Sequence, residues 1–387
     1  MRGPLRERRL APVRAAGGQP AGERDGLRAA QRAPLPGGPR VSVLIVTGAA
    51  GWLGQNLVAD VREGAVQAAA QPLLAGIDAL RVLARDAEEA AALRALAPDA
   101  ELVVGDVCDA RTCTELCQGA AGGVLIHAAG VIHPKTTAGF RVNELGTTRV
   151  LAAARRAELA RVVYLSSNSP LGLNPFPEHR FDEASPYRPY LGYGRSKQRA
   201  EQHTFAAHQP GRLETSIVRA PWFYGPRQPP RQTSFFELIR DGKAPTIGSG
   251  DNLRSMAYTG NLVQGLLLAA YRPEAAGRAW WIADERPYSW REVLETTRRV
   301  LEQELGRPCA ESRLRLPALV GRIARAGDAL LQAVGAYEQR LHVLGELDRT
   351  IACSVRAAQR ELGYRPEVAL EEGMRRSVRW LIEAGWS

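Results

Sequence analysis

Short apolar runs alternate with Ala-, Leu- and Arg-rich stretches of helical periodicity from Val41 onward. This alternation is typical of βαβ units that build a parallel sheet. Some runs consist only of Val, Ile and Leu, as expected for strands buried on both faces. Strands are expected at residues 41–46, 80–84, 101–104, 124–128, 161–166, 215–219 and 280–283. The sequence therefore predicts an α/β fold with a Rossmann-type, doubly wound parallel sheet.

The pattern loosens after Tyr224, where Pro and Gly residues separate short segments. Helices are expected near residues 290–304, 316–334 and 370–384. We expect an NAD(P)-binding Rossmann domain over residues 41–225, to which the strand near 280–283 returns. A smaller, mostly helical substrate-binding region should follow over residues 226–387.

One apolar stripe at helical spacing lies in this second region. It consists of Leu316, Leu319, Val320, Ile323, Leu330, Leu331 and Val334. Such a stripe usually packs into the core, and the alternative is a wall of the substrate pocket. We therefore expect the stripe to be buried.

The formal net charge of the 387-residue chain is +10, and most of it belongs to the first 40 residues. That segment holds nine arginines against three acidic residues, a net charge of +6, which leaves +4 for the rest. It is rich in Gly, Pro and Ala and has no aromatic residue, so we expect residues 1–40 to be disordered. Nucleic-acid binding is not expected, because the basic residues do not gather on the folded part. No apolar run is long enough to cross a bilayer, so we expect no transmembrane segment. The expected cytoplasmic location depends instead on the cysteines.

The five cysteines are an odd number, which favours reduced thiols. Cys108, Cys113 and Cys117 lie close together, but no CxxC pair and no His/Cys pair at zinc spacing accompanies them. We therefore expect no metal site.

A glycine-rich turn, TGAAGWLG at 47–54, follows the first predicted strand and leads into a helical stretch. Gly48 permits the tight turn, Gly51 lets the backbone approach a pyrophosphate, and Gly54 lets the helix pack closely on the strand. The order of strand, glycines and helix predicts a dinucleotide site.

The end of the second predicted strand bears on the choice between NAD and NADP. A carboxylate there would bond the ribose hydroxyls of NAD, whereas an arginine accommodates the 2′-phosphate of NADP. Ala84 and Arg85 occupy this place and favour NADP, but Asp86 follows directly. NAD is the alternative, because a strand that ends one residue later would present Asp86 to the ribose.

Tyr193 and Lys197 are four residues apart, so on a helix they face the same cleft. A lysine ammonium favours the phenolate form of a nearby tyrosine, which can exchange a proton with a substrate hydroxyl or carbonyl during hydride transfer. Ser167 follows the run at 161–166 and would lie at the carboxyl edge of the sheet, where its hydroxyl can bond the reacting oxygen. These three residues are the expected catalytic group.

Several ordered motifs make residues 41–380 similar to the extended short-chain dehydrogenase/reductases, the NAD-dependent epimerase/dehydratase and 3β-hydroxysteroid-dehydrogenase-like group. The motifs are TGAAGWLG at 47–54, GDVCD at 105–109, IHAAG at 126–130, NELGT at 143–147, SSNSPLG at 166–172, YGRSK at 193–197, RAPWFYGP at 219–226 and the segment with Arg254, Tyr258 and Asn261. The resemblance implies catalytic roles for Ser167, Tyr193 and Lys197, and a bond from Lys197 to the nicotinamide ribose. With Arg85 included, the expected cofactor contacts are Gly48, Gly51, Trp52, Leu53, Gly54, Arg85, Asp106, Val107, Ala128, Ala129, Gly130, Tyr193, Lys197 and Pro221.

Departures from the family pattern narrow the chemistry. Sugar dehydratases of this group carry an acid pair after the Ser/Thr, but Asn168 and Ser169 stand here, which disfavours dehydration. Epimerases usually carry an asparagine where this chain has Trp222. Against this, Arg254 matches the arginine that clamps a substrate diphosphate in the sugar enzymes, with a local pairing to Asp251 as the alternative. The expected substrate contacts are Ser167, Trp222 and Arg254.

The sequence therefore predicts an NAD(P)-dependent oxidoreductase that acts on a secondary alcohol or ketone, with Tyr193 as the acid/base. The first alternative is a nucleotide-sugar 4-epimerase that keeps NAD tightly bound. The second is a non-catalytic NAD(P)-binding regulatory protein, which the presence of both Tyr193 and Lys197 disfavours. The expected partner is a small-molecule substrate, and a homodimer is left open.

Overall fold

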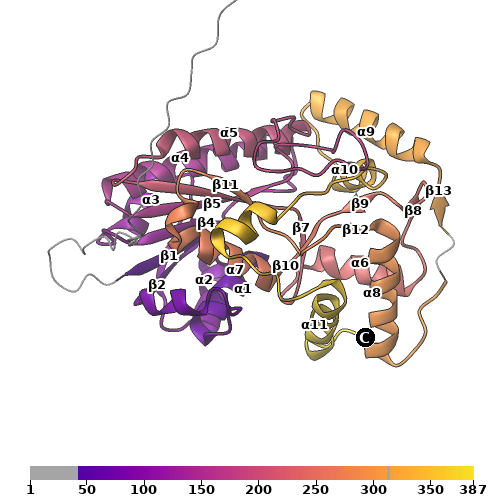
Figure 1. The fold of residues 1–387 in the computed structure, drawn as a ribbon, viewed down its shortest axis with the longest axis horizontal. Coiled ribbons are helices and arrows are strands. Elements are labelled where there is room, and N and C mark those ends of the chain that lie inside the picture. The colour runs from indigo at the N-terminus through magenta and orange to yellow at the C-terminus, as the bar shows by residue number, and fades with distance from the viewer. Residues whose placement is uncertain (1–41, 312–313) are drawn as a thin grey trace, which may run out of the picture. The chain divides into compact units, whose positions relative to one another are not determined.

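The computed structural model describes residues 42–311 and 314–387 (Figure 1). The expectation of a disordered segment over residues 1–40 lies outside the described residues. A seven-stranded sheet in the order β11-β6-β5-β4-β1-β2-β3 forms the centre, and every neighbouring pair is parallel. Its strands are β1 (Val43–Thr47), β2 (Ala79–Ala84), β3 (Glu101–Val104), β4 (Val124–His127), β5 (Arg161–Ser167), β6 (Glu214–Ala220) and β11 (Ala279–Trp281). The predicted doubly wound sheet is confirmed.

Helices cover both faces of the sheet, because alternate residues of a strand point to opposite sides. Leu44 and Val46 of β1 pack in the cluster that contains buried residues of α1, α2 and α7. Val43 and Ile45 pack on the other face with α3 and α4, and α5 lies against α4. These helices are α1 (Trp52–Glu63), α2 (Ala87–Leu96), α3 (Ala110–Cys117), α4 (Arg141–Arg156), α5 (Leu191–Ala207) and α7 (Thr259–Tyr271).

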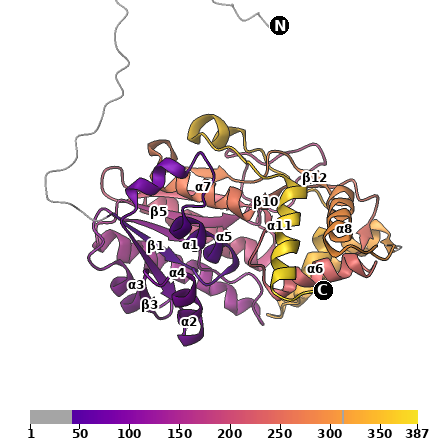
Figure 2. The ribbon, with the colours of Figure 1, turned by 90° about the horizontal axis from the view of Figure 1, so that it is seen from below.

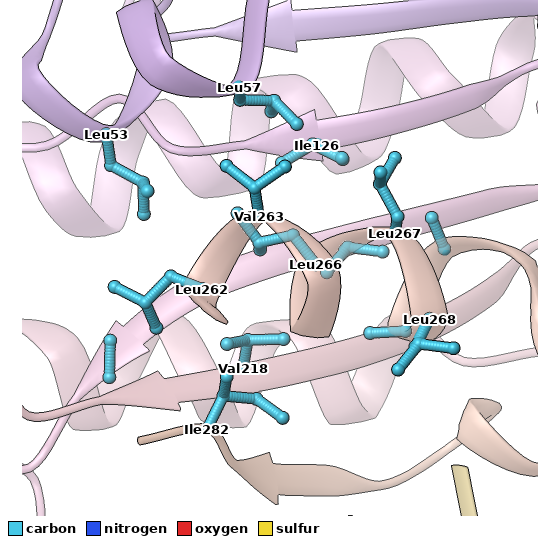
Figure 3. Packing of buried hydrophobic residues seen from close by; sticks show 14 of the residues in the cluster. Leu53, Leu57, Ile126, Val218, Leu262, Val263, Leu266, Leu267, Leu268 and Ile282 are labelled. Carbon is cyan, nitrogen blue, oxygen red and sulfur yellow. The ribbon is translucent and has the colours of Figure 1, made fainter. Parts of the chain in front are cut away.

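Helix α7 is apolar on nearly all sides and lies buried between α1 and the sheet (Figure 3). Leu262, Val263, Leu266 and neighbouring leucines of this helix are fully buried. A helix that is hydrophobic all round belongs in a core. Gly265 allows its close approach to the segment after β11, since a Cβ there would collide with the Ile282 side chain.

Short strand pairs and five further helices lie beside the sheet (Figure 2). The strands are β7 (Trp222–Tyr224), β8 (Thr246–Ile247), β9 (Leu253–Arg254), β10 (Met256–Tyr258), β12 (Tyr288–Ser289) and β13 (Arg315–Leu316). The helices are α6 (Pro230–Arg240), α8 (Trp290–Leu305), α9 (Ala318–Ala333), α10 (Gln339–Glu346) and α11 (Leu370–Glu383). Helix α8 packs against α6 and α11 around a second core that includes Phe236 and Trp290.

One expectation for this region is wrong. Four of the seven residues of the apolar stripe predicted to be buried face outward, with Leu319, Ile323, Leu330 and Val334 exposed to 58, 62, 71 and 79%, while Leu316, Val320 and Leu331 are half-buried. The reason is that polar contacts hold the opposite face of α9 against the protein. Helix α10 was not predicted at all.

The five cysteines are free thiols, and all of them except Cys108 are buried. In the described part of the chain, no group of three or more His, Cys, Asp or Glu side chains could hold a metal ion. None of the helices described here combines the length and the apolar content needed to cross a membrane.

Candidate active site

The turn between β1 and α1 lies where the strand order reverses. Strand β1 pairs with β2 on one side and with β4 on the other, and open α/β sheets bind ligands at such a point. Gly48 has a φ of 70°, and a Cβ there would lie 2.5 Å from the Ala129 backbone nitrogen. A Cβ on Gly54 would collide with the Gly48 carbonyl oxygen. The turn therefore requires glycine at both positions.

The start of α1 fits a pyrophosphate. Its N-cap residue Gly51 is exposed, no side chain caps the helix, and its first turn has no acidic residue. Backbone N–H groups at such a helix start are available to an anion, and the helix dipole favours negative charge there. A dinucleotide bound here would meet backbone groups rather than side chains.

The other residues predicted to contact the cofactor lie around the same edge of the sheet. They differ in how exposed they are and in the hydrogen bonds that they already form. Asp106 is exposed, and its Oδ1 accepts a hydrogen bond from the Cys108 backbone (2.8 Å). The Trp52 indole donates to the Pro226 carbonyl (2.9 Å), and the Leu53 side chain is buried, so Leu53 can offer only its backbone. Val107 and Pro221 are buried, whereas Ala128 and Ala129 are half-buried and Gly130 is exposed.

Arg85 directly follows β2, and its side chain is 73% exposed. Its guanidinium lies 3.3 Å from the Asp86 carboxylate and 3.0 Å from the Glu89 carboxylate. Asp86 also caps α2 by accepting a hydrogen bond from the Glu89 backbone (2.9 Å). The strand end therefore presents a cation, while the neighbouring carboxylate is engaged by the helix.

Tyr193 and Lys197 lie one turn apart and are both buried on α5. Lys197 Nζ donates to the Leu165 carbonyl (2.9 Å) and lies 4.7 Å from the centre of the Tyr164 ring. Ser167 is the last residue of β5, and its hydroxyl interacts with the Tyr193 phenol. The structure thus brings the three residues predicted to be catalytic to one edge of the sheet.

The electrostatics of this group follow mainly from burial. Burial raises the pKa of Tyr193 to about 12, although the Ser167 hydroxyl and the charge of Arg231 act in the opposite direction. Burial lowers the pKa of Lys197 to about 8, and the Glu201 carboxylate opposes this shift. At neutral pH Tyr193 is therefore a phenol beside a protonated lysine, which is the form that can donate a proton to a carbonyl oxygen.

A buried carboxylate fixes the position of α5. Glu201 lies one turn after Lys197 and is fully buried. It accepts hydrogen bonds from the Ser166 hydroxyl (2.5 Å), the Tyr187 hydroxyl (2.7 Å) and the Arg219 guanidinium (2.7 Å). Since these donors belong to β5, β6 and the loop before α5, Glu201 ties the helix that carries Tyr193 to the sheet.

Trp222 and Arg254, predicted to contact substrate, are in contact with each other. The Arg254 guanidinium lies 4.5 Å from the centre of the Trp222 ring, is buried, and donates to the Glu346 carbonyl of α10. Asp251 pairs with Arg291 (2.7 Å), so the alternative ion pair between Arg254 and Asp251 does not form. Nε and Nη1 of Arg254 find no hydrogen-bond partner in the described residues.

Sequence reasoning missed the approach of α9 and α10 to this site. His342 Nδ1 lies 2.6 Å from the Asp328 carboxylate, and its ring centre lies 4.9 Å from that of Tyr190. The negative charge of Glu346 adds to the raised pKa of Tyr193. These residues carry no motif, so only the tertiary structure reveals them.

Phe140 and Asn143 were also missed, although Asn143 stands in the quoted NELGT motif. The Phe140 ring lies 5.9 Å from that of Tyr193. Asn143 Nδ2 donates to the Val131 carbonyl (2.9 Å) and to the Ser196 hydroxyl (3.0 Å). The NELGT motif is the signal that could have found Asn143, whereas Phe140 stands in none of the quoted motifs.

Comparison with known proteins agrees with this geometry. Residues 44–283 match the model of the NAD dependent epimerase/dehydratase family. The chain belongs to this family. It is therefore an enzyme of the extended short-chain dehydrogenase/reductase type.

Two relatives and one solved structure illustrate the similarity. The chain is 46% identical over 348 residues to the uncharacterized protein y4nL of Sinorhizobium fredii, covering 89% of this chain and 96% of that protein. It is 31% identical over 345 residues to the 4-hydroxy-2-methyl-3-oxo-4-farnesyl-3,4-dihydroquinoline-1-oxide ketoreductase of Stigmatella aurantiaca. This match covers 85% of this chain and 93% of that protein. The solved structure is the dTDP-glucose 4,6-dehydratase DesIV of Streptomyces venezuelae with NAD and TYD bound, which is 25% identical with a TM-score of 0.68. The match covers 89% of this chain and 99% of that chain.

Proposed function

We propose that this enzyme oxidises or reduces a secondary alcohol or ketone, with Tyr193 as the acid/base. A bound nicotinamide would accept or supply the hydride. In the reducing direction Tyr193 donates its phenolic proton to the carbonyl oxygen, while the Ser167 hydroxyl holds that oxygen. The Lys197 ammonium stabilises the phenolate that is left.

The apolar character of the substrate side carries this proposal. Trp222 stacks on the Arg254 guanidinium, and Arg254 is bonded to α10 instead of facing an open space. Trp222 also packs, together with Phe235 and Leu344, against the cluster that contains Trp290. A ligand seated against these side chains meets aromatic and aliphatic groups, which suits an apolar alcohol or ketone. The Stigmatella aurantiaca relative is named as a ketoreductase of a farnesyl-bearing compound, which supports the same direction.

The residues beside Ser167 favour simple oxidation or reduction over dehydration. The Asn168 amide oxygen lies 3.3 Å and the Ser169 hydroxyl 3.4 Å from the Ser167 hydroxyl. Neither side chain can protonate a leaving hydroxyl near neutral pH.

We propose NADP as the preferred cofactor. The Arg85 guanidinium is largely exposed, and its two surface ion pairs are weak competitors for a 2′-phosphate, which an arginine binds with two parallel hydrogen bonds. Asp86 already accepts a backbone hydrogen bond from α2 and is less suited to bond a ribose. NAD is the alternative, in line with the description of the family.

The test is an assay of the full-length protein with NADPH and a panel of apolar aryl and polycyclic ketones, followed by absorbance at the nicotinamide band. The expected result is ketone-dependent NADPH oxidation, with product alcohol found by mass spectrometry, and its loss in Tyr193→Phe. Turnover of nucleotide sugars alone, with no ketone reduced, would overturn the proposal.

A second candidate is nucleotide-sugar 4-epimerisation, and one observation favours it. Two buried Arg254 nitrogens have no hydrogen-bond partner in the described residues, although Nη1 lies 3.9 Å from the Glu346 carboxylate, and both could bond a diphosphate if α10 shifted away. The same protein is therefore incubated with UDP- and dTDP-hexoses, and inversion at C4 is followed by NMR. Inversion without net consumption of cofactor would establish this second function.

A further inference from the structure

Helix α9 exposes large apolar residues on one face and buries small and polar residues on the opposite face. The residues it buries are Gly321, Ala324, Asp328 and Gln332. The large residues that it exposes are Leu319, Ile323, Leu330 and Val334, which follow one face for about four turns. This is the reverse of the usual arrangement of a surface helix.

Hydrogen bonds fix this orientation. Gln332 accepts from the Gly192 backbone at the start of α5 (2.9 Å) and donates to Asp328 (2.8 Å). Asp328 in turn bonds His342 of α10 (2.6 Å), and Arg325 is paired with Asp348. A rotation that buried the leucines would break these bonds and bring apolar side chains against Tyr190 and Tyr193. The apolar face is thus held outward by contacts to the active site.

Single exposed leucines are common, but a contiguous apolar face marks a contact surface. Arginines flank this one: Arg315, Arg322 and Arg340 are exposed and form no side-chain ion pair with any described residue. The exposed acids nearest to them along the chain are Glu311, four residues before Arg315, and Glu338, two residues before Arg340; Arg322, on α9 itself, has no exposed acid within ten residues. An apolar stripe with a basic border matches a surface that is apolar inside and anionic outside.

We propose that α9 docks the enzyme on an anionic phospholipid bilayer, with its apolar stripe in the boundary between headgroups and acyl chains. A second copy of the chain fits less well. The face is about 24 Å long and about 10 Å wide, which is far below the roughly 800 Å² per partner of a stable dimer. Two such faces would also bring their arginines together.

A hollow of about 670 Å³ beside α9 adds to the argument. It is lined by Glu338, Arg340, Leu341 and Leu344 of the α10 segment. Leu341 packs at Gly327 of α9, and Leu344 packs, like Trp222, against the cluster that contains Trp290. Docking of α9 would place this hollow at the bilayer surface. If the proposed function is right, an apolar substrate that leaves the lipid would meet this hollow first; the docking itself does not depend on that function.

The test is sedimentation of the full-length protein with two kinds of vesicle: phosphatidylcholine alone, and phosphatidylcholine with about one third phosphatidylglycerol. We expect binding to the anionic vesicles that weakens at about 0.5 M salt. Ile323→Glu combined with Leu330→Glu should reduce the binding roughly 100-fold, since two apolar side chains leave the lipid and two negative charges oppose it. Arg322→Glu should reduce it by about ten-fold.

Phe176→Glu is the matched control, because Phe176 is 54% exposed on a loop outside α9, and it should bind like the parent. All proteins keep the basic first 40 residues, so their contribution cancels. Leu319→Gln combined with Val334→Gln is a second pair, used should the first not fold by circular dichroism. Unchanged binding in a folded α9 pair, or no binding by the parent, would overturn the proposal. So would a parental dimer in light scattering that the α9 pair converts to monomer.

Discussion

The sheet side and the α9–α10 side of the candidate active site are built in opposite ways. On the sheet side, apolar residues point inward and the reactive side chains stand at strand ends and on α5. On the other side, α9 and α10 point Asp328, Gln332 and His342 inward, and α9 carries its apolar residues on the outside. The same apolar spacing can therefore mark either a core or an outer face of a helix. What decides is whether polar partners already occupy the inner side.

The largest expected effect is on turnover, which should depend on a tyrosine of the sheet side and not on a tyrosine of the α10 side. Tyr193→Phe removes the group that transfers the proton, so turnover of the identified substrate should fall roughly 100- to 10,000-fold. Cofactor affinity should stay within a few-fold. Tyr337→Phe is the matched variant on the α10 side, where the hydroxyl bonds His133 (2.8 Å), and it should keep at least a third of the parental rate. Steady-state kinetics and cofactor titration measure both, and a Tyr193→Phe rate above about a tenth of the parent would remove Tyr193 from this role.

The next effect tests the packing difference between α7 and α9. Leu266→Ala in α7 leaves a cavity in the core and should lower the free energy of unfolding by about 2–5 kcal/mol. Leu330→Ala removes the same atoms from the exposed face of α9 and should change it by less than about 0.5 kcal/mol. Urea denaturation of both variants gives the values. Equal losses would show that the α9 face is covered in solution.

The sheet side of the site could be predicted from the sequence, whereas the α9–α10 side could not. The glycine turn, Ser167, Tyr193 and Lys197 could be found because strand ends and a four-residue spacing fix their places locally. Glu346 meets Arg254 across 92 positions of the chain, and no local pattern records such a contact. The outward face of α9 could not be predicted either, because periodicity shows that a helix has two faces but not which of them is buried.

Cofactor choice should depend on the sheet side alone. NADP should bind more tightly than NAD by ~1.5–3 kcal/mol, and Arg85→Asp should reverse the order, because the guanidinium that bonds the 2′-phosphate is lost. Arg94→Asp, at the far end of α2, is the control with the same charge change. Fluorescence titration of both cofactors measures the preference. If Arg85→Asp leaves it unchanged, Arg85 is only a solvated residue at the strand end.

The smallest expected effect is on stability: the contribution of the α9–α10 side to the free energy of unfolding should depend on pH. Burial by itself would lower the pKa of His342, but the bond to Asp328 and the charge of Glu346 outweigh it, so the pKa is raised above 6.5. The folded state thus binds this proton more tightly, and the resulting stability is complete below pH 6.5 and lost as the pH rises through the raised value. Asp328→Asn should therefore cost about 1–3 kcal/mol near pH 6 and less near pH 9. Thermal and urea unfolding at both values provide the measurement; a cost that grows with pH would contradict the assignment, and Leu266→Ala should show no such trend.

The buried thiols have a consequence for following motion in this enzyme. Burial raises the pKa of Cys113, Cys117 and Cys353 to about 12, so almost none of these sulfurs is a reactive thiolate at neutral pH while the fold is closed. An alkylating reagent can reach them only when the surrounding segment opens. Cys113 and Cys117 would then report openings of α3, and Cys353 openings of the segment that pairs with Phe181 beside the sheet. The alkylation rates of these native thiols therefore measure local unfolding, and mass spectrometry can follow them without any introduced cysteine.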